Sequence, residues 1–369
     1  MPEITHRKKR LSSFKLIVLG FAGVIVLGAL ILMLPFSSTA GVVTPFHEAL
    51  FTSTSAVCVT GLVVQDTGSY WSAFGQTVIL LLIQIGGLGV VTVAALFAML
   101  SGRKISLMQR STMQDAISAP KVGGIVRLTR FIVRGTFLIE LIGMIVMLPT
   151  FCGNYGIKGI WMAAFHSVSA FCNAGFDILG TAENKYPSLT GYIGNPAINI
   201  TIMLLIIVGG IGFLTWDDIY TNKWHFKKYR MQSKVILVTT AILIIAPAVF
   251  FFFCDFTGLP LAERILASLF QSVTPRTAGF SVCRKKDDAE VCGRRIDGSV
   301  VKNAAAVAVM YFLLFFVGGI VISTAEGLPL STCLYETASA VGTVGLTLGI
   351  TPQLGVLSQL ILIVLMYLG

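Results

Sequence analysis

Four short segments of this chain are versions of one another, and this repetition limits its architecture more than any other feature. They lie at residues 51–62, 165–176, 270–280 and 335–346 and read FTSTSAVCVTGL, FHSVSAFCNAGF, FQSVTPRTAGF and YETASAVGTVGL. Each begins with an aromatic residue, continues with small hydroxyl residues and ends in a glycine followed by Leu or Phe. In an apolar chain, four copies of one polar loop predict four walls of a single ion pore.

The composition is that of a polytopic membrane protein. Apolar residues make up 55% of the 369 residues and charged residues 12%, which is about half the charge of a soluble domain. Several apolar runs reach the roughly 20 residues that span a bilayer as a helix. The predicted spans lie near residues 16–34, 73–100, 131–149, 193–215, 235–254, 304–322 and 354–369.

The basic residues predict the topology. Of the 27 Lys and Arg residues, 23 fall in four segments, 1–15, 103–134, 221–234 and 281–302. Short basic loops stay in the cytoplasm, so we expect a multi-pass protein of the plasma (inner) membrane with all four segments and the N-terminus inside. Attraction to anionic lipid accounts for the net charge of +10, and no nucleic-acid partner is needed to explain it.

Each unit is expected to contain an outer helix, a pore helix, a polar loop and an inner helix. The fold class is therefore an all-α polytopic membrane protein with four pseudo-repeated units around one central pore. The predicted units are 1–126, 127–231, 232–300 and 301–369. The polar loops are too short to span, and such backbone enters a membrane only where it lines a cavity or is buried in protein.

The inner helices of the first two units carry similar glycine clusters, QIGGLG at 84–89 and VGGIG at 208–212. Glycines at such positions let helices approach closely or bend. They do not indicate a nucleotide-binding loop, because no strand precedes them and their surroundings are apolar.

The loop chemistry points to a potassium filter. A dehydrated potassium ion needs its water replaced by oxygens, and rings of backbone carbonyls supply them. Glycine permits the backbone angles that turn successive carbonyls toward one axis, and the C-terminal ends of the pore helices favour a cation. The alternative, flexible glycine turns between helices, fits one loop better than four. The predicted ion-binding residues are Val59, Thr60, Gly61, Asn173, Ala174, Gly175, Thr277, Ala278, Gly279, Thr343, Val344 and Gly345.

Other chemistry finds little support in the sequence. No spacing of His, Cys and carboxylate residues suggests a metal site other than potassium at the filter. A polytopic membrane enzyme would need a cluster of His, Asp or Glu, or a Ser/His pair, and the chain has none in a suitable pattern. We therefore expect no cofactor in this chain and no enzymatic activity.

The pattern VTGL, NAGF, TPRTAGF and TVGL on four helix–loop–helix units closely resembles the Trk/Ktr/HKT superfamily of potassium transporters, with the bacterial Ktr membrane subunit as the nearest form. The resemblance covers most of residues 11–369. It implies potassium uptake down the electrochemical gradient, sodium dependence in some members, and a homodimer of two pores embedded in lipid. It also implies gating by a cytoplasmic TrkA/KtrA-like ring, with the regulatory nucleotide bound to that partner.

The third unit departs from this pattern. The filter glycines are 114, 104 and then only 66 residues apart, and four residues separate Gly279 from the basic Arg284. A crossing needs about 20 residues, so the third inner helix, which carries the gating loop in the family, is expected to be missing. The fourth inner helix stops at Gly369, where the family continues.

Two explanations of this short third unit stay open. The sequence omits stretches of a longer protein, which we favour because the remaining units look intact, or the chain is a deletion variant. In the second case it would act as a non-conducting membrane scaffold or assembly fragment.

Several polar residues have two interpretations each. Glu140 lies in the middle of a span, where a carboxylate is a functional candidate, and a structural hydrogen bond to a neighbouring helix is as well supported. Glu48, Asp66 and Asp177 flank the first two filter loops, either as an acidic mouth that concentrates cations or as solvated loop charges.

The remaining candidates are assigned mostly structural roles. Asn173 either lines the ion path or holds its loop, Arg276 is expected to brace the third loop, and His166 is expected to be a packed polar residue. The 103–126 loop, with Arg110, is either a docking surface for a cytoplasmic partner or a plain amphipathic connector.

Overall fold

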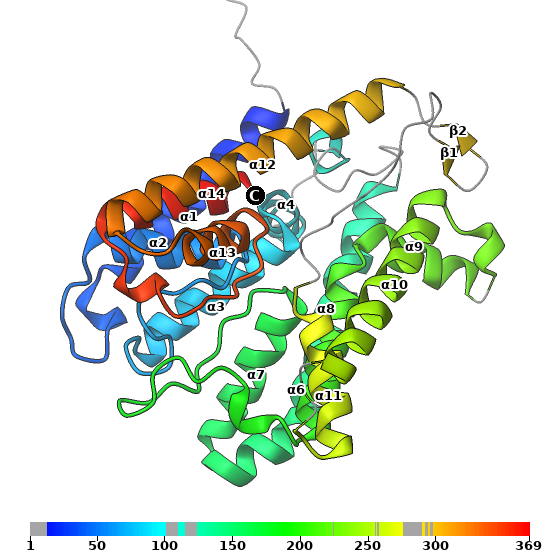
Figure 1. The fold of residues 1–369 in the computed structure, drawn as a ribbon. Helices are drawn as coiled ribbons and strands as arrows, with labels where there is room; N and C mark the ends of the chain where they lie inside the picture. Colours follow the sequence, from blue (N-terminus) through cyan, green and yellow to red (C-terminus); the bar gives the residue numbers. More distant parts are fainter. Residues whose placement is uncertain are drawn as a thin grey trace, which may run out of the picture.

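The computed structural model describes residues 13–100, 110–114, 124–223, 225–254, 256, 258–275, 290–291, 294–295 and 298–369. Over these residues the chain is almost entirely helical (Figure 1). The α-helices are α1 (Ser13–Leu32), α2 (Phe46–Val57), α3 (Ala73–Leu88), α4 (Val90–Leu100), α6 (Ile125–Tyr155), α7 (Lys158–Phe171), α8 (Pro196–Gly210), α9 (Phe213–Asn222), α10 (Met231–Cys254), α11 (Leu261–Val273), α12 (Gly298–Glu326), α13 (Leu330–Val341) and α14 (Val356–Leu368).

Short elements complete the described chain. The 3-10 turns are η1 (Pro35–Ser37), η2 (Thr190–Tyr192), η3 (Phe226–Lys228) and η4 (Thr351–Gln353). The strands β1 (Glu290–Val291) and β2 (Arg294–Arg295) form a small antiparallel ladder that pairs Glu290 with Arg295.

Four described helices, in α1, α6, α10 and α12, are long and apolar enough to cross a bilayer. Two bent pairs, α3 with α4 and α8 with α9, raise the number to six if each pair is one span. The helix α14 is apolar but shorter. These helices coincide with the predicted apolar runs and make the chain a multi-pass all-α membrane protein.

Two predicted spans are bent pairs of helices, and each bend lies at a glycine cluster where the sequence analysis allowed one. The run at 73–100 breaks at Gly89 with a bend of 99°, and the run at 193–215 breaks at Gly212 with a bend of 95°. Both glycines have the same backbone, with φ 81° and ψ 134° or 148°. Side chains rarely tolerate this conformation, so the last glycine of each cluster bends its inner helix.

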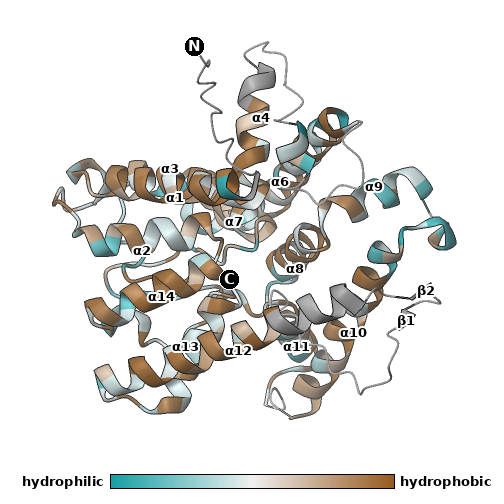
Figure 2. Cartoon of the chain, turned by 90° about the horizontal axis from the view of Figure 1, so that it is seen from above, coloured by the Kyte–Doolittle hydropathy of each residue, from teal (hydrophilic) through white to brown (hydrophobic). Residues whose placement is uncertain are grey.

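The helices pack as units arranged in a ring. The most extensive contacts join each outer helix (α1, α6, α10, α12) to the pore helix that follows it (α2, α7, α11, α13). Each described inner helix also contacts the pore helix of the next unit: α3 contacts α7, α8 contacts α11, and α14 contacts α2. Figure 2 shows these groups around a common centre, near the C-terminal end of the chain.

The ring is asymmetric on one side. Among the described helices, no inner helix lies between the third unit (α10 and α11) and the fourth (α12 to α14), and these two units share no extensive contact. The first, second and fourth units each contribute to a buried apolar cluster. The third unit has no inner helix between α11 and α12 in the described residues.

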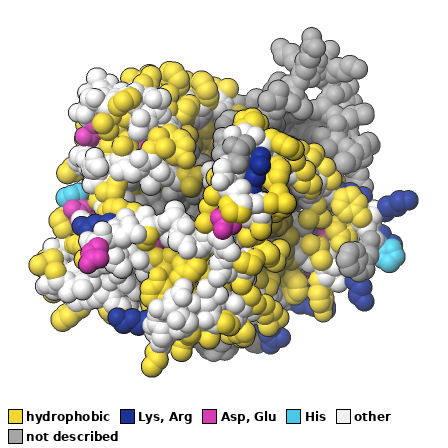
Figure 3. All heavy atoms as spheres, turned by 60° about the horizontal axis from the view of Figure 1, so that its bottom comes forward, with side chains coloured by type: hydrophobic (Ala, Val, Ile, Leu, Met, Phe, Trp, Pro, Cys, Tyr) yellow, Lys and Arg dark blue, Asp and Glu magenta, His cyan; other side chains and the backbone are white. Residues whose placement is uncertain are grey.

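The outer surface of the ring is apolar. Leu27, Ile245 and Phe312, on three different outer helices, are each at least 60% exposed. Figure 3 shows one face on which apolar side chains dominate and charged side chains are few and scattered. An exposed surface of this kind is suited to lipid and would be a liability in water.

The bend at Gly212 gives a first prediction. A Cβ at residue 212 would meet no atom within 4 Å, so Gly212→Ala introduces backbone strain without a clash. We expect the free energy of unfolding to fall by about 1–3 kcal/mol, seen as a lower melting temperature of the purified protein. Gly191→Ala, which also has open space but no positive φ, is the control, and an equal loss there would contradict the assignment.

Candidate functional site

Three of the four pore helices, α2, α7 and α13, end in described loops with one shared hydrogen-bond pattern. After α2, α7 and α13, the amide five residues after a serine donates to the carbonyl of that serine. The bonds are Thr60 N to Ser55 O at 2.8 Å, Ala174 N to Ser169 O at 2.8 Å and Val344 N to Ser339 O at 2.9 Å. Each bond directs the loop back under the last turn of its pore helix, so the three loops have equivalent geometry.

In the same three loops, residues with positive φ alternate with residues whose φ is not positive. Two residues before each filter glycine, a non-glycine residue has positive φ; these residues are Val59 (57°), Asn173 (60°) and Thr343 (48°). The glycines follow at Gly61 (90°), Gly175 (68°) and Gly345 (83°), and the residue between is not left-handed. Such alternation turns successive carbonyls to one side of the chain. Positive φ is uncommon for Val and Thr, and three equivalent instances indicate a conformation that the surroundings impose.

The described loops touch through their glycines. A Cβ on Gly345 would overlap the carbonyl oxygen of Thr60 in the first unit, and a Cβ on Gly61 would overlap that of Ala174 in the second. Each glycine therefore lies against the residue that precedes the glycine of the next unit. Only a residue without a side chain permits this approach, so the loops of units four, one and two form three consecutive sides of a ring.

The inner helices support the loops in the same way. Each has a glycine whose Cβ would overlap the last carbonyl of its own pore helix. The pairs are Gly86 with Val57, Gly209 with Phe171 and Gly369 with Val341. The close approach predicted for the two glycine clusters is therefore a contact with the backbone just before the filter.

Hydroxyl groups tie the pore helices to the outer helices. Each lies eight residues before a filter glycine and donates to an outer-helix carbonyl. The bonds are Ser53 to Ile25 at 2.7 Å, Ser167 to Glu140 at 2.6 Å and Thr337 to Phe315 at 3.1 Å. These small hydroxyl residues of the repeated segments are thus structural donors that hold the pore helices to the outer helices.

The third loop lies outside the described residues, including Arg276, Thr277, Ala278 and Gly279. A cavity of about 410 Å³ lies between the second and fourth loops and α11. The cavity is lined by Asn173, Gly175, His166, Phe270, Val344 and Gly345, among others.

Asp66 has neither of the roles considered from the sequence. Its side chain is only 4% exposed. It accepts hydrogen bonds from the amide of Ser69 at 2.7 Å, the hydroxyl of Ser69 at 2.6 Å and the amide of Tyr186 at 2.9 Å. Asp66 therefore joins the segment after the first loop to the segment after the second.

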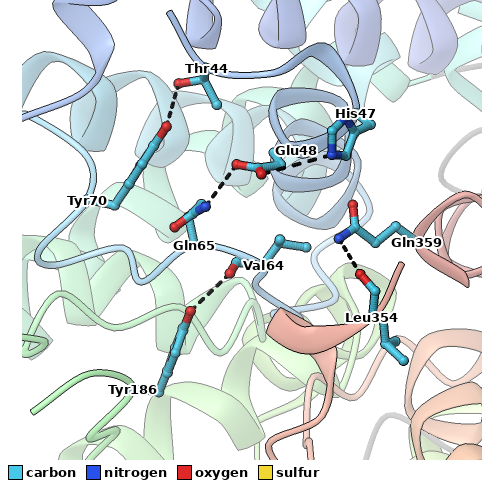
Figure 4. A network of polar contacts seen from close by, with 9 residues as sticks. All are labelled: Thr44, His47, Glu48, Val64, Gln65, Tyr70, Tyr186, Leu354 and Gln359. Atoms are coloured by element: carbon cyan, nitrogen blue, oxygen red, sulfur yellow. Dashed lines mark hydrogen bonds and ion pairs between the residues drawn. The ribbon is translucent and has the colours of Figure 1, made fainter. Parts of the chain in front are cut away.

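The other contacts around this segment also hold it in place, as Figure 4 shows. Tyr186 donates to the carbonyl of Val64 at 2.9 Å, and Gln65 donates to Glu48 at 2.9 Å. Glu48 is half-buried and lies 3.9 Å from the ring of His47. Glu48 therefore helps to fix the loop as well as carrying charge near it.

Asp177 is the acidic residue that faces the cavity. The pKa of its carboxyl is raised to about 6, mainly by burial. The amide of Leu179, which donates to the carboxyl at 3.0 Å, acts against this rise, and the nearby Asp66 adds to it. The carboxyl is therefore largely ionised at pH 7 and becomes neutral as the pH falls below about 6.

Glu140 and His166 are packed polar residues. Glu140 is 5% exposed and accepts a hydrogen bond at 3.0 Å from Gln84 of α3, which is the structural bond between helices considered from the sequence. His166 is 3% exposed, lies 2.8 Å from the carbonyl of Met162 through Nδ1 and stacks on Phe151. Asn173 has a buried Oδ1 without a hydrogen-bond partner in the described chain.

One buried carboxylate near the fourth loop escaped the sequence analysis. Glu336 of α13 is fully buried and accepts three hydrogen bonds from the segment after the fourth filter glycine. The only sequence signal was a lone carboxylate in the repeated segment. The first and second copies have Thr and His at this place, and the third, which is one residue shorter, has Phe or Gln depending on the alignment.

Comparison with known proteins finds cation transport proteins. A family model described as TrkH, cation transport protein, matches residues 14–285 and 282–369. The potassium/sodium uptake protein NtpJ of Enterococcus hirae is 35% identical over 418 residues, covering 98% of this chain and 91% of NtpJ. The Ktr system potassium uptake protein B of Bacillus subtilis is 34% identical over 409 residues, covering 96% of this chain and 90% of that protein.

A solved structure has the same fold. The crystal structure of the potassium transporter TrkH from Vibrio parahaemolyticus matches with a TM-score of 0.72 at 15% identity. The match covers 100% of this chain and 84% of that one.

The role of Asp66 gives the second prediction. Asp66→Ala removes the acceptor of three donors, two on the half-buried Ser69 and the amide of Tyr186, and leaving a buried donor without its acceptor costs about 1–3 kcal/mol. We expect a clear drop in the melting temperature of the purified protein. Asp217→Ala is the control, because its carboxylate is 33% exposed and, among the described residues, pairs only with Arg230, and a surface ion pair contributes about 0–1 kcal/mol. Equal losses in both variants would remove the special role of Asp66.

Proposed function

Because the chain belongs to the TrkH family of cation transport proteins, we propose that it takes up potassium across the plasma membrane through a filter formed by its four repeated loops. The chain is a multi-pass membrane transport protein, and its relatives are transporters and not enzymes. The names of NtpJ and of the Ktr protein of Bacillus subtilis refer to potassium/sodium uptake and to potassium uptake. Both names support potassium as the ion.

One observation carries this proposal, the repeated backbone alternation in the loops. Positive φ at Val59, Asn173 and Thr343, each followed after one residue by a glycine of positive φ, turns consecutive carbonyls to the same side. Backbone carbonyls that replace the hydration shell are the means by which potassium filters bind their ion. The third loop, with Thr277, Ala278 and Gly279, completes this filter in the proposal.

The transport path follows from the positions of the groups. Hydrated potassium collects near Asp177, whose carboxylate faces the cavity beside the filter. It exchanges water for the carbonyls of Thr60, Asn173, Thr277 and Thr343 and their neighbours. Below the filter it passes the inner helices, which bend at glycine. The C-terminal ends of the pore helices point at the ion and favour its positive charge.

Regulation is part of the proposal. The gate responds to a cytoplasmic TrkA/KtrA-like ring that carries the nucleotide, the N-terminus lies in the cytoplasm, and two copies of the chain form a homodimer. The name of the Bacillus subtilis relative refers to a Ktr system, and the name of NtpJ supports a role for sodium. The short helical segment at 110–114, where Arg110 is exposed, belongs to the basic loop on which the ring would dock.

The short third unit favours a second candidate, a non-conducting scaffold or assembly fragment. The alignment with NtpJ spans 418 positions, so at least 49 of them face gaps in this chain of 369 residues. The two matches of the family model meet at residues 282–285, where the third inner helix is expected. Growth of potassium-uptake-deficient cells at low potassium separates the candidates, because a scaffold restores none.

The filter assignment gives the third prediction. Gly345→Ser places a side chain against the carbonyl of Thr60 and strains a residue of positive φ. A change of about 1.4 kcal/mol in relative ion stabilisation is a factor of ten, and we expect the preference for potassium over sodium to fall by roughly this factor. The measurement is competitive uptake of the two ions. Gly41→Ser, which also has positive φ but open space, is the control, and an unchanged preference in Gly345→Ser would contradict the filter.

The proposed role of Asp177 in collecting cations beside the filter gives the fourth prediction. Because its pKa is raised to about 6, lowering the external pH from 7.5 to 5 neutralises the carboxyl and removes its attraction for cations. We expect the uptake rate at low potassium to fall by up to about tenfold, the lower end of the enhancement that charged clefts give. Asp177→Asn should be slow at both pH values. A variant that keeps the pH dependence of the unmodified protein would assign that dependence to another group.

A further inference from the structure

The segment after the fourth filter glycine is held to its pore helix by one buried carboxylate. Glu336 lies nine residues before Gly345 and is 0% exposed. Its Oε1 accepts from the hydroxyl of Thr347 at 2.5 Å and the amide of Leu348 at 3.0 Å. Its Oε2 accepts from the hydroxyl of Thr351 at 2.7 Å. Both oxygens are thus used by groups that follow the filter.

The first and second units hold their filters with a different residue. Six residues before the filter glycine, the first, second and fourth units each have a serine. Ser55 accepts a hydrogen bond from the amide of Gly61 at 3.1 Å, and Ser169 donates to the carbonyl of Phe176 at 2.7 Å. The equivalent Ser339 has a buried hydroxyl with no partner in the described chain. In the fourth unit Glu336 therefore takes over the role that serine has in the other two.

The segment that Glu336 holds has few other supports. Thr347 and Leu348 are exposed, Leu348 to 57%. Over the described residues, all hydrogen bonds that join residues 346–351 to α13 end on Glu336. Thr347 in turn accepts from the amide of Gly349 at 2.9 Å, so the carboxylate organises the turn that leads away from the filter.

The place of the fourth loop in the ring makes this brace important. On one side Gly345 lies against Thr60 of the first unit. The other side of the fourth loop faces the third unit. The fourth unit shares no extensive contact with that unit in the described chain. The first and second loops, by contrast, are joined to each other through Asp66 and Tyr186. The fourth loop must therefore take its position mainly from its own pore helix.

We propose that Glu336 is a positioning residue that sets the ion preference of the transporter by fixing the backbone of the fourth loop. This inference rests on the proposed filter function. The three hydrogen bonds that Glu336 accepts on a rigid helix keep the carbonyls of the fourth loop at the spacing that fits one ion. Without them the exposed segment relaxes, the carbonyls of Thr343 and Val344 follow, and smaller ions are accommodated.

The test compares three substitutions at residue 336. Glu336→Ala removes the acceptors, and we expect the preference for potassium over sodium in competitive uptake to fall roughly tenfold, equivalent to about 1.4 kcal/mol. Glu336→Gln keeps the brace, because its amide oxygen accepts from Thr347 and Leu348 while its NH2 donates to the hydroxyl of Thr351. We expect Gln to retain the preference. Equal losses in Gln and Ala would assign the effect to the negative charge and overturn a positioning role.

Two controls separate positioning from general stability. Glu326 of α12 accepts from the amide of Gly355 at 2.9 Å and the hydroxyl of Ser358 at 2.5 Å, at the start of α14. Glu326→Ala should lower the melting temperature without changing the ion preference. If Glu336→Ala does not fold, Glu336→Asp, whose shorter side chain cannot reach all three donors, is measured in its place, and an unchanged preference in a folded variant overturns the proposal.

The serine position offers a matched pair. Ser339→Ala removes a hydroxyl without a partner and should leave the ion preference unchanged, whereas Ser55→Ala removes the acceptor of Gly61 and should lower it. A loss in Ser339→Ala equal to that in Ser55→Ala would mean that serine holds the fourth loop after all.

Gly345→Ser separates a failure of the Glu336 support from a failure of the proposed filter. If it changes the ion preference and Glu336→Ala does not, the filter stands and the brace fails. If neither variant changes it, the proposed filter itself fails.

Discussion

The close approach of glycine backbone to carbonyl groups is the contact on which the rest of this structure depends. Gly86 and Gly209 let the inner helices pack directly on the last carbonyls of the pore helices, and Gly61 and Gly345 let neighbouring loops touch. These contacts leave no room for a Cβ, so the distance between elements is set by the backbone itself. A filter made of backbone carbonyls needs this kind of support, because side chains have rotamers and backbone walls do not.

Polar side chains then fix what the glycines bring together, and they do so differently in each unit. The donors on the pore helices, such as Ser53 and Ser167, are equivalent in sequence and in contact. The supports beyond the filter are not equivalent: Asp66 joins two units, whereas Glu336 acts within one. Buried carboxylates in an apolar protein are costly unless they are fully hydrogen-bonded, and both of these are, which makes them suitable as rigid supports.

The sequence was sufficient to predict the features that repeat. The four loops, the apolar runs and the family resemblance follow from local patterns, and the glycine clusters predicted close approach or bending. It was insufficient where a residue acts through a distant partner. Asp66 was expected to face solvent or ions, yet its acceptor role depends on Tyr186, 120 residues away. The glycine cluster at 84–89 indicated a possible bend but not its size, because an apolar run has the same composition whether its helix is straight or bent.

The ring makes the units dependent on one another. Each described inner helix packs on its own pore helix and on that of the next unit, so the position of one filter loop is set partly by its neighbour. Between the third and fourth units the described chain has no such helix, and there the fourth loop is tied to its own pore helix by Glu336. A support within the unit is effective where a support between units is weakest, since it does not require the neighbour to be in place. The loop that is held by glutamate and not by serine is thus the loop that has no described inner helix between its unit and the preceding one.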